Sequence, residues 1–182
     1  MSHLFHVLAT LTAGAFLLVA CGGEPSSVTW RNVTIEIPDG WYVFEETDTR
    51  LSLSNAEIGP EAIRSADDVP DEDVVAIFLT YEPATVPDDW RRYTEQQDAT
   101  LEEDEAIILG DGVPATRLVF DYVTGGIPLR EMVVVIPSHG IVALAQPVPS
   151  LGRTDGPDVF LEYRDRFDDV LESATFGPPA GG

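Results

Sequence analysis

The amino-acid sequence predicts an α+β domain in which an antiparallel sheet carries packed helices. Short segments that alternate apolar and polar residues recur along the chain, and Gly, Pro and Asp separate them. Two other segments repeat apolar residues at helical spacing, one in the middle of the chain and one near its end. The sequence contains no internal repeat, so we expect one domain.

The first half of the domain is predicted to consist of short strands. The segment VTIEI (33–37) alternates apolar and polar residues, and Pro38-Asp39-Gly40 ends it. WYVF (41–44) resumes an extended pattern, and LSLS (51–54) is another short alternation. VVAIFLTY (74–81) is rich in β-branched and aromatic residues, which is typical of a central strand.

A helix is predicted to begin near Pro87. Asp88 and Asp89 follow in its first turn, where carboxylates interact favourably with the positive end of the helix dipole. We expect the buried face of this helix to be formed by its large apolar side chains, Trp90, Tyr93 and Leu101.

The second half of the chain is predicted to form an antiparallel meander of three strands. Turn residues separate them, Gly125-Gly126 at the first junction and Ser138-His139-Gly140 at the second. The three runs are TRLVFDYV (116–123), LREMVVVI (129–136) and IVALAQ (141–146), and the shorter apolar run AIIL (106–109) precedes them.

A second helix, capped by Asp155, is predicted to close the domain. Its apolar residues recur at helical spacing, at Val159, Phe160, Tyr163, Phe167, Val170 and Leu171. We expect the three aromatic side chains to lie against the sheet. The charged side chains between them, Arg164, Asp165 and Asp168, are expected outside.

The N-terminus has the features of an exported, lipid-modified protein. Residues 7–20 carry no charge and are fewer than the roughly 20 residues that a membrane-spanning helix needs. Leu18-Val19-Ala20-Cys21 resembles the bacterial lipobox, in which the peptide is cut before the cysteine and the thiol carries a diacylglycerol. We therefore predict lipidation at Cys21, with acyl chains such as palmitate, and a position on the extracytoplasmic side of the cell membrane.

This anchor sets the predicted domain boundaries. Residues 1–20 are the expected signal peptide, 21–32 a lipid-anchored tether, 33–176 the α+β domain and 177–182 a disordered tail. Because the anchor uses the one cysteine of the chain, the folded domain has no disulfide and depends on its core alone.

The charge of the chain excludes several partners. Asp and Glu number 32 and Arg 10, Lys is absent, and the formal net charge is −22. No basic patch of the density that nucleic acid requires can form, and adsorption to anionic lipid is equally disfavoured. Five carboxylates within residues 67–73 predict at most a weak attraction for divalent cations, and we expect neither a specific metal site nor a cofactor.

Several motifs together resemble the PsbP-like domains, including the LpqN-type bacterial lipoproteins. IEIPDGWYVFE resembles the opening strand and turn of that family, and DGVPATRLVFDY, LREMVVVIPSHGIVALAQ and YRDRFDDVLESATF resemble its later strands and closing helix. The resemblance implies a non-enzymatic binding or assembly module on the outer face of a membrane, acting through a protein partner. It also implies that Trp41 is an aromatic anchor of the core.

The sequence offers few residues for catalysis, and we expect the protein not to be an enzyme. His139 is the one histidine after the predicted cleavage site, and its place in a turn beside Ser138 is not expected to form a nucleophile–base pair. Schiff-base chemistry would need Lys. Two alternatives to the binding module remain: a carboxylate-dependent hydrolase, for which Asp121 is the most interesting acid, and a carrier that holds a lipid or small apolar ligand between sheet and helix.

Overall fold

The computed structural model describes residues 26–58, 73–148 and 155–178. The predicted signal peptide, Cys21, most of the acidic segment 67–73 and residues 179–182 lie outside these ranges. The described elements are, in chain order, β1 (Ser26–Trp30), β2 (Val33–Ile37), β3 (Tyr42–Glu46), β4 (Arg50–Ser54), β5 (Val75–Tyr81), α1 (Pro87–Gln96), β6 (Thr100–Ile108), the short 3₁₀ turn η2 (Gly110–Gly112), β7 (Pro114–Thr124), β8 (Ile127–Ile136), β9 (Ile141–Pro147), α2 (Gly156–Glu172) and β10 (Thr175–Phe176).

The main sheet has seven antiparallel strands in the order β3-β4-β5-β9-β8-β7-β6. The predicted meander of β7, β8 and β9 is confirmed, because these strands are consecutive neighbours in it. Gly125 and Gly126 form the first turn with positive φ, a conformation that glycine adopts without a steric penalty. A smaller sheet of β1, β2 and β10 packs beside it.

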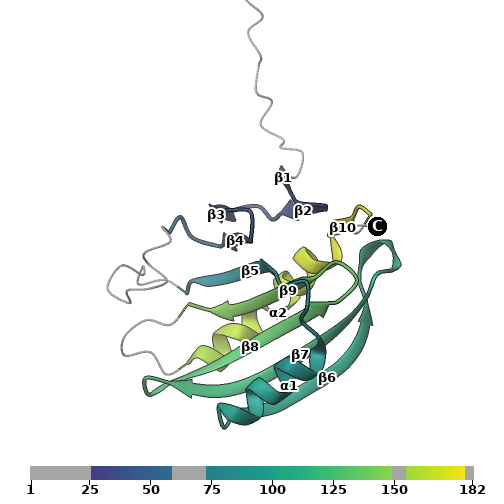
Figure 1. The fold of residues 1–182 in the computed structure, drawn as a ribbon. Helices are drawn as coiled ribbons and strands as arrows, with labels where there is room; N and C mark the ends of the chain where they lie inside the picture. The colour runs from purple at the N-terminus through teal and green to yellow at the C-terminus, as the bar shows by residue number, and fades with distance from the viewer. Residues whose placement is uncertain (1–25, 59–72, 149–154, 179–182) are drawn as a thin grey trace, which may run out of the picture.

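The two helices lie on opposite faces of the main sheet (Figure 1). The longer helix, α2, runs across the central strands β8 and β9. The shorter helix, α1, contacts β6 and β7 near one edge of the other face. The fold is therefore of the predicted α+β class.

The main core lies between the sheet, α2 and the small sheet. Phe160 and Phe167 on α2 are fully buried there, as their helical spacing predicts. Trp41 packs its ring edge-on against Phe167, with ring centroids 6.4 Å apart. Trp30 is also buried, and its indole Nε1 donates a hydrogen bond to the carbonyl of Thr47 at 2.7 Å.

Ion pairs fasten α2 to the edge of the sheet. Both terminal nitrogens of Arg164 donate hydrogen bonds to the carboxylate of Glu103 on β6. Arg117 on β7 donates to Asp168 at 3.0 Å and to Glu105 at 2.8 Å. The hydrogen bonds from Arg164 hold the pKa of the Glu103 carboxyl below its usual range. The expectation that Arg164 and Asp168 lie outside is wrong, because these half-buried groups find partners of opposite charge on the sheet.

The start and end of the folded domain also differ from the sequence prediction. Ser26–Trp30 pairs with β2 as strand β1, so part of the expected tether belongs to the domain. At the other end, the Gly177 amide donates to the Asn32 carbonyl, and the Asn32 side chain donates to the carbonyl of Pro178. The first residues of the expected tail are therefore hydrogen-bonded to the turn between β1 and β2.

The expected buried face of α1 is wrong in two of its three residues. Leu101 belongs to β6, and the side chains of Leu101 and Tyr93 are 39% and 45% exposed. The helix ends before Leu101, after Gln96, and Asp98 follows with a positive φ of 53°. Trp90 alone of the three packs on the sheet, and it remains partly exposed.

Replacing Phe167 by Ala is expected to destabilise the fold strongly, because the ring is fully buried between α2 and the sheet. Truncation of a buried aromatic side chain costs about 3–5 kcal/mol. Asp165→Ala on the exposed side of the same helix is the control and should change the free energy of unfolding by less than about 0.5 kcal/mol. Urea denaturation would measure both, and equal losses would contradict the assignment of the helix faces.

Candidate binding site

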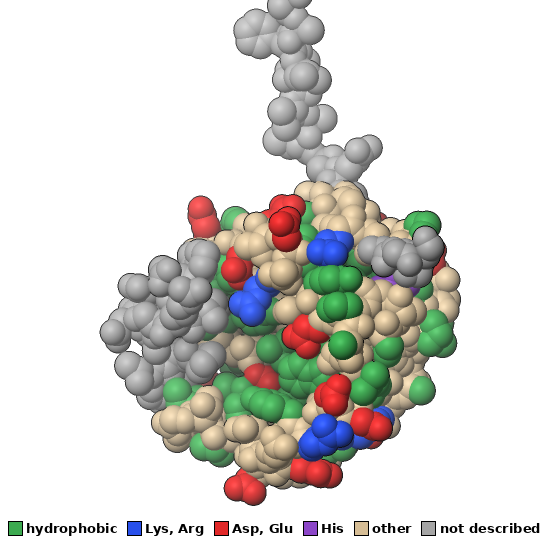
Figure 2. Space-filling view, viewed as in Figure 1, with side chains coloured by type: hydrophobic (Ala, Val, Ile, Leu, Met, Phe, Trp, Pro, Cys, Tyr) green, Lys and Arg blue, Asp and Glu red, His purple; other side chains and the backbone are tan. Residues whose placement is uncertain are grey.

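The face of the main sheet opposite α2 carries a hollow of about 280 Å³, which we call the α1-face hollow. Figure 2 shows hydrophobic side chains gathered in a depression on this face. The hollow is lined by four apolar residues, Phe78, Trp90, Val142 and Leu144, and by four polar ones, Arg50, Thr80, Glu82 and Gln146. Its volume is close to the lower end of the range for small-molecule sites.

Strand pairing explains why these side chains meet. On the floor, Leu144 of β9 pairs with Phe78 of β5, and Val142 pairs with Thr80. Thr80 in turn pairs with Arg50 of β4. Side chains two residues apart on a strand share a face. The cross-strand row Arg50–Thr80–Val142 therefore lies beside the row Phe78–Leu144 on one surface.

The hollow has a roof only over part of its floor. Trp90 reaches it from the first turns of α1, beside the cluster that Phe120, Val133 and Val142 form on the sheet. Because α1 contacts the β6–β7 side of the sheet, it leaves the floor over β5 and β9 partly open. Leu144 is accordingly only half-buried, although it lies on a central strand.

The two ends of the hollow differ in chemistry. Val142 and Gln146 are four residues apart on β9, which corresponds to about 13 Å along a strand. Arg50, Thr80 and Glu82 lie toward the Val142 end, and they supply a cation, a hydroxyl and a carboxylate. Gln146 supplies an amide at the opposite end.

A buried acid lies beside the Gln146 end. Met132 of β8 pairs with Ala145 of β9, which places Glu131 next to Gln146 across the two strands. Glu131 is only 6% exposed, and the hydroxyl of Tyr122 donates a hydrogen bond to its Oε1. Burial raises the pKa of the Glu131 carboxyl to about 7, and burial together with this neighbouring charge raises the pKa of Tyr122 as well.

Sequence reasoning did not identify Arg50 or Glu131 as candidate residues. The signal for Glu131 is its position in LREMVVVI, where it falls on the same strand face as Val133 and Val135. A charged residue on that face must be buried with the two valines. Nothing local marks Arg50, because its neighbours in the hollow come from distant parts of the chain.

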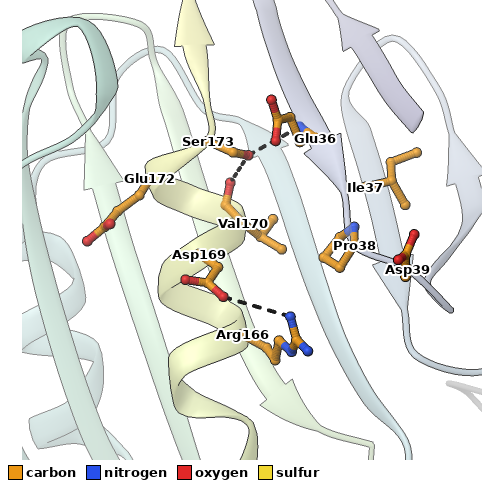
Figure 3. A pocket seen from close by; sticks show the side chains of 9 residues that line it. All are labelled: Glu36, Ile37, Pro38, Asp39, Arg166, Asp169, Val170, Glu172 and Ser173. Atoms are coloured by element: carbon orange, nitrogen blue, oxygen red, sulfur yellow. Dashed lines mark hydrogen bonds and ion pairs between the residues drawn. The ribbon is translucent and has the colours of Figure 1, made fainter. Parts of the chain in front are cut away.

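A second cleft, of about 570 Å³, lies between β2 with the turn after it and the C-terminal end of α2 (Figure 3). Its lining is strongly acidic, with Glu36 and Asp39 on one side and Asp169 and Glu172 on the helix. Asp169 is paired with Arg166 at 3.9 Å. The Oγ of Ser173 accepts a hydrogen bond from the Glu36 amide and donates one to the Val170 carbonyl, which ties the two sides together.

The acid that the sequence singled out is engaged in an ion pair. Asp121 on β7 accepts two hydrogen bonds from Arg130 on β8, both at 2.6 Å. Its two carboxylate oxygens are thereby held by a single guanidinium. Asp121 lines neither described cleft, so the structure does not bring it together with a second acid there.

His139 and Ser138 do face each other, contrary to expectation. Nδ1 of the imidazole lies 2.9 Å from the serine Oγ, and Nε2 lies 3.2 Å from the carbonyl of Gly177. With the proton on Nε2, the ring donates to that carbonyl and accepts from the serine. The ring also packs against Phe176, with centroids 4.9 Å apart and the planes tilted by 49°, so His139 fastens the C-terminal segment to the β8–β9 turn.

Within residues 26–58, 73–148 and 155–178, no three His, Cys, Asp or Glu side chains converge as a metal site would require. None of the helices in this described part combines the length and the apolar character of a membrane span. Cys21 lies outside it.

Comparison with known proteins gives a likeness of fold. No protein-family model matches the sequence, and no curated protein matches it. Among solved structures, the chain is similar to PA94 from Pseudomonas aeruginosa, a protein of unknown function, with a TM-score of 0.50 and 14% identity over 86% of this chain and 99% of that one. A protein from Bacteroides thetaiotaomicron has a TM-score of 0.31 and 14% identity over 81% of this chain and 45% of its own. At this identity the likeness to PA94 shows the fold alone.

The buried acid predicts a specific pH dependence. Because the folded-state pKa of Glu131 is about 7 against an ordinary value of 4.5, its stabilising contribution is full below pH 4.5 and is lost as the pH rises through 7. Glu131→Gln removes this titration, so the variant should gain about 3 kcal/mol relative to the wild type between pH 4.5 and pH 8.

Urea denaturation across this pH range would measure the difference between the two proteins. Glu102→Gln is the matched control, because Glu102 is exposed on β6. Its free energy of unfolding should follow that of the wild type at every pH. A difference between wild type and Glu131→Gln that does not change with pH would contradict the raised pKa.

Proposed function

We propose that this protein is a membrane-anchored, non-enzymatic binding module on the outer face of the cell membrane. In this proposal the α1-face hollow holds the apolar part of a lipid or another small ligand. The observation that carries it is the apolar floor beneath Trp90, in which Leu144 is half-buried and Phe78 and Val142 lie buried beside it. Apolar side chains at a hollow with a few polar groups around them are typical of small-molecule binding sites.

The apolar lining is unusual for its surroundings. The chain carries a formal charge of −22, and most of its ionised groups must lie at the surface. Leu144 and Trp90 nevertheless remain partly exposed beside each other in one hollow. Covering them with an apolar ligand would remove apolar surface from water, at roughly 25 cal/mol for each Å².

The membrane location in this proposal is supported by the sequence. The uncharged segment 7–20 and the Leu-Val-Ala-Cys motif that ends at Cys21 favour export and lipidation. The finer fold assignment, a PsbP-like domain of the LpqN type, belongs to the same proposal and is supported by the order of its motifs. A carrier at a membrane surface would give an apolar molecule a short path to and from the lipid.

Filling the hollow tests the binding function. Leu144→Trp should place a larger side chain on the floor and weaken binding of the neutral fluorophore N-phenyl-1-naphthylamine by about tenfold or more, because close packing leaves no room for both. The titration would use the full-length chain carrying Cys21→Ser, so that no attached lipid competes.

Leu161→Trp is the matched control, since Leu161 is 50% exposed on α2, across the sheet from the hollow. It should bind the fluorophore like its parent. Circular dichroism and thermal unfolding would establish that both variants are folded. Equal affinities in the parent and in folded Leu144→Trp would overturn the assignment of the ligand to this hollow.

Replacing Cys21 by Ser should abolish the anchor. The wild-type protein is expected to partition into the detergent phase of a Triton X-114 separation and to carry the mass of a diacylglycerol. The variant should carry no acyl mass and, because the cut before residue 21 is blocked as well, should keep residues 1–20. Wild-type protein found in the aqueous phase, with an unmodified thiol by mass spectrometry, would show that the lipoprotein proposal is wrong.

A further inference from the structure

We propose that the ligand of the α1-face hollow is a single-chain amphiphile with a zwitterionic head, in which Arg50 binds the anionic group, Glu82 the cationic group, and the apolar floor the alkyl chain. This inference rests on the proposed function, because it names the class of ligand that the same hollow would take. It follows from two opposite charges at one end of an apolar surface.

Arg50 has hydrogen-bonding capacity to spare. Its Nη1 lies 3.8 Å from Oε2 of Glu45, a distance beyond hydrogen bonding, and that oxygen already accepts a hydrogen bond from the hydroxyl of Ser52 at 3.2 Å. The guanidinium side chain is 49% exposed. By contrast, Arg117, Arg130 and Arg164 each make charged hydrogen bonds of 3.0 Å or less.

Glu82 supplies the opposite charge at the same end of the hollow. It follows Thr80 by two residues, and Thr80 pairs directly with Arg50. The backbone of Glu82 is fixed there, because its amide donates to the carbonyl of Gly140 at 2.7 Å. Among the described residues, no ion pair joins Arg50 to Glu82, so each charge can face a ligand group of its own.

A zwitterionic head also suits the charge of the whole protein. A purely anionic amphiphile would be repelled by a chain of formal charge −22, and a purely cationic one would be repelled locally by Arg50. A head that is neutral overall escapes the long-range repulsion and satisfies both local charges. The single chain follows from the volume of about 280 Å³ and from a floor about 13 Å long.

The test compares four probes that share an unbranched ten-carbon skeleton: 2-aminodecanoate, decanoate, decylamine and 1-decanol. Each would be titrated, below its aggregation concentration, into the full-length Cys21→Ser chain at pH 7, with displacement of N-phenyl-1-naphthylamine as the readout. We expect 2-aminodecanoate to bind most tightly. Arg50→Gln should weaken 2-aminodecanoate and decanoate by about fivefold and leave decylamine and 1-decanol no weaker.

Glu82→Gln should give the converse pattern, with weaker binding of 2-aminodecanoate and decylamine. Arg92→Gln is the control, because Arg92 on α1 is 64% exposed and does not line the hollow. It should leave all four affinities unchanged. Arg50 is exposed and Glu82 is half-buried. The midpoint of thermal unfolding of Arg50→Gln and of Glu82→Gln should therefore be close to that of the parent.

The outcomes separate this inference from the proposed function. Equal binding of 2-aminodecanoate and 1-decanol, or indifference of both to Arg50→Gln and Glu82→Gln, would overturn the zwitterionic head. The apolar hollow would stand in that case, provided Leu144→Trp still blocks 1-decanol. Failure of every probe, N-phenyl-1-naphthylamine included, to bind would overturn both proposals.

Discussion

The central strands of this sheet are apolar on both faces, and that constraint shapes the rest of the molecule. β5, β8 and β9 bury most of their residues, on both faces, so each face needs a cover. On one face the cover consists of α2, through Phe160 and Phe167, and of the small sheet. On the other, α1 is short and lies toward β6 and β7, so the floor over β5 and β9 is left with an incomplete roof. The hollow is therefore a product of unequal helix coverage.

Several arginines of the described residues join neighbouring elements of the fold. With ten Arg against 32 acids, most carboxylates must face solvent, so the few charge-paired arginines stand out. Arg130 joins β8 to β7, and Arg164 joins α2 to β6. Arg31 lies over the ring of Tyr81 at 3.6 Å from its centroid, which fastens the β1–β2 turn to the main sheet.

The fold could be predicted from the sequence where periodicity and burial agree. The meander and α2 were found because their apolar residues repeat at the spacing of the element, and Phe167 was placed correctly for that reason. Strand β6 was mostly missed, since TLEEDEAII is dominated by the acids of an exposed edge strand. The candidate site was not found, because Arg50, Trp90 and Leu144 are brought together by pairing between distant strands. From the sequence, only the hypothesis of a ligand between sheet and helix can be formed.

The early start of β1 has a mechanical consequence. β1 begins at Ser26 and pairs with β2. At most the segment 21–25 could therefore serve as a tether between the proposed lipid on Cys21 and the folded domain. A chain of that length reaches no more than about 17 Å when fully extended, against roughly 40 Å for the 21–32 tether. A domain held this closely samples a thin layer of solvent above the bilayer. Its encounters with molecules leaving the lipid would thus occur at a high effective concentration.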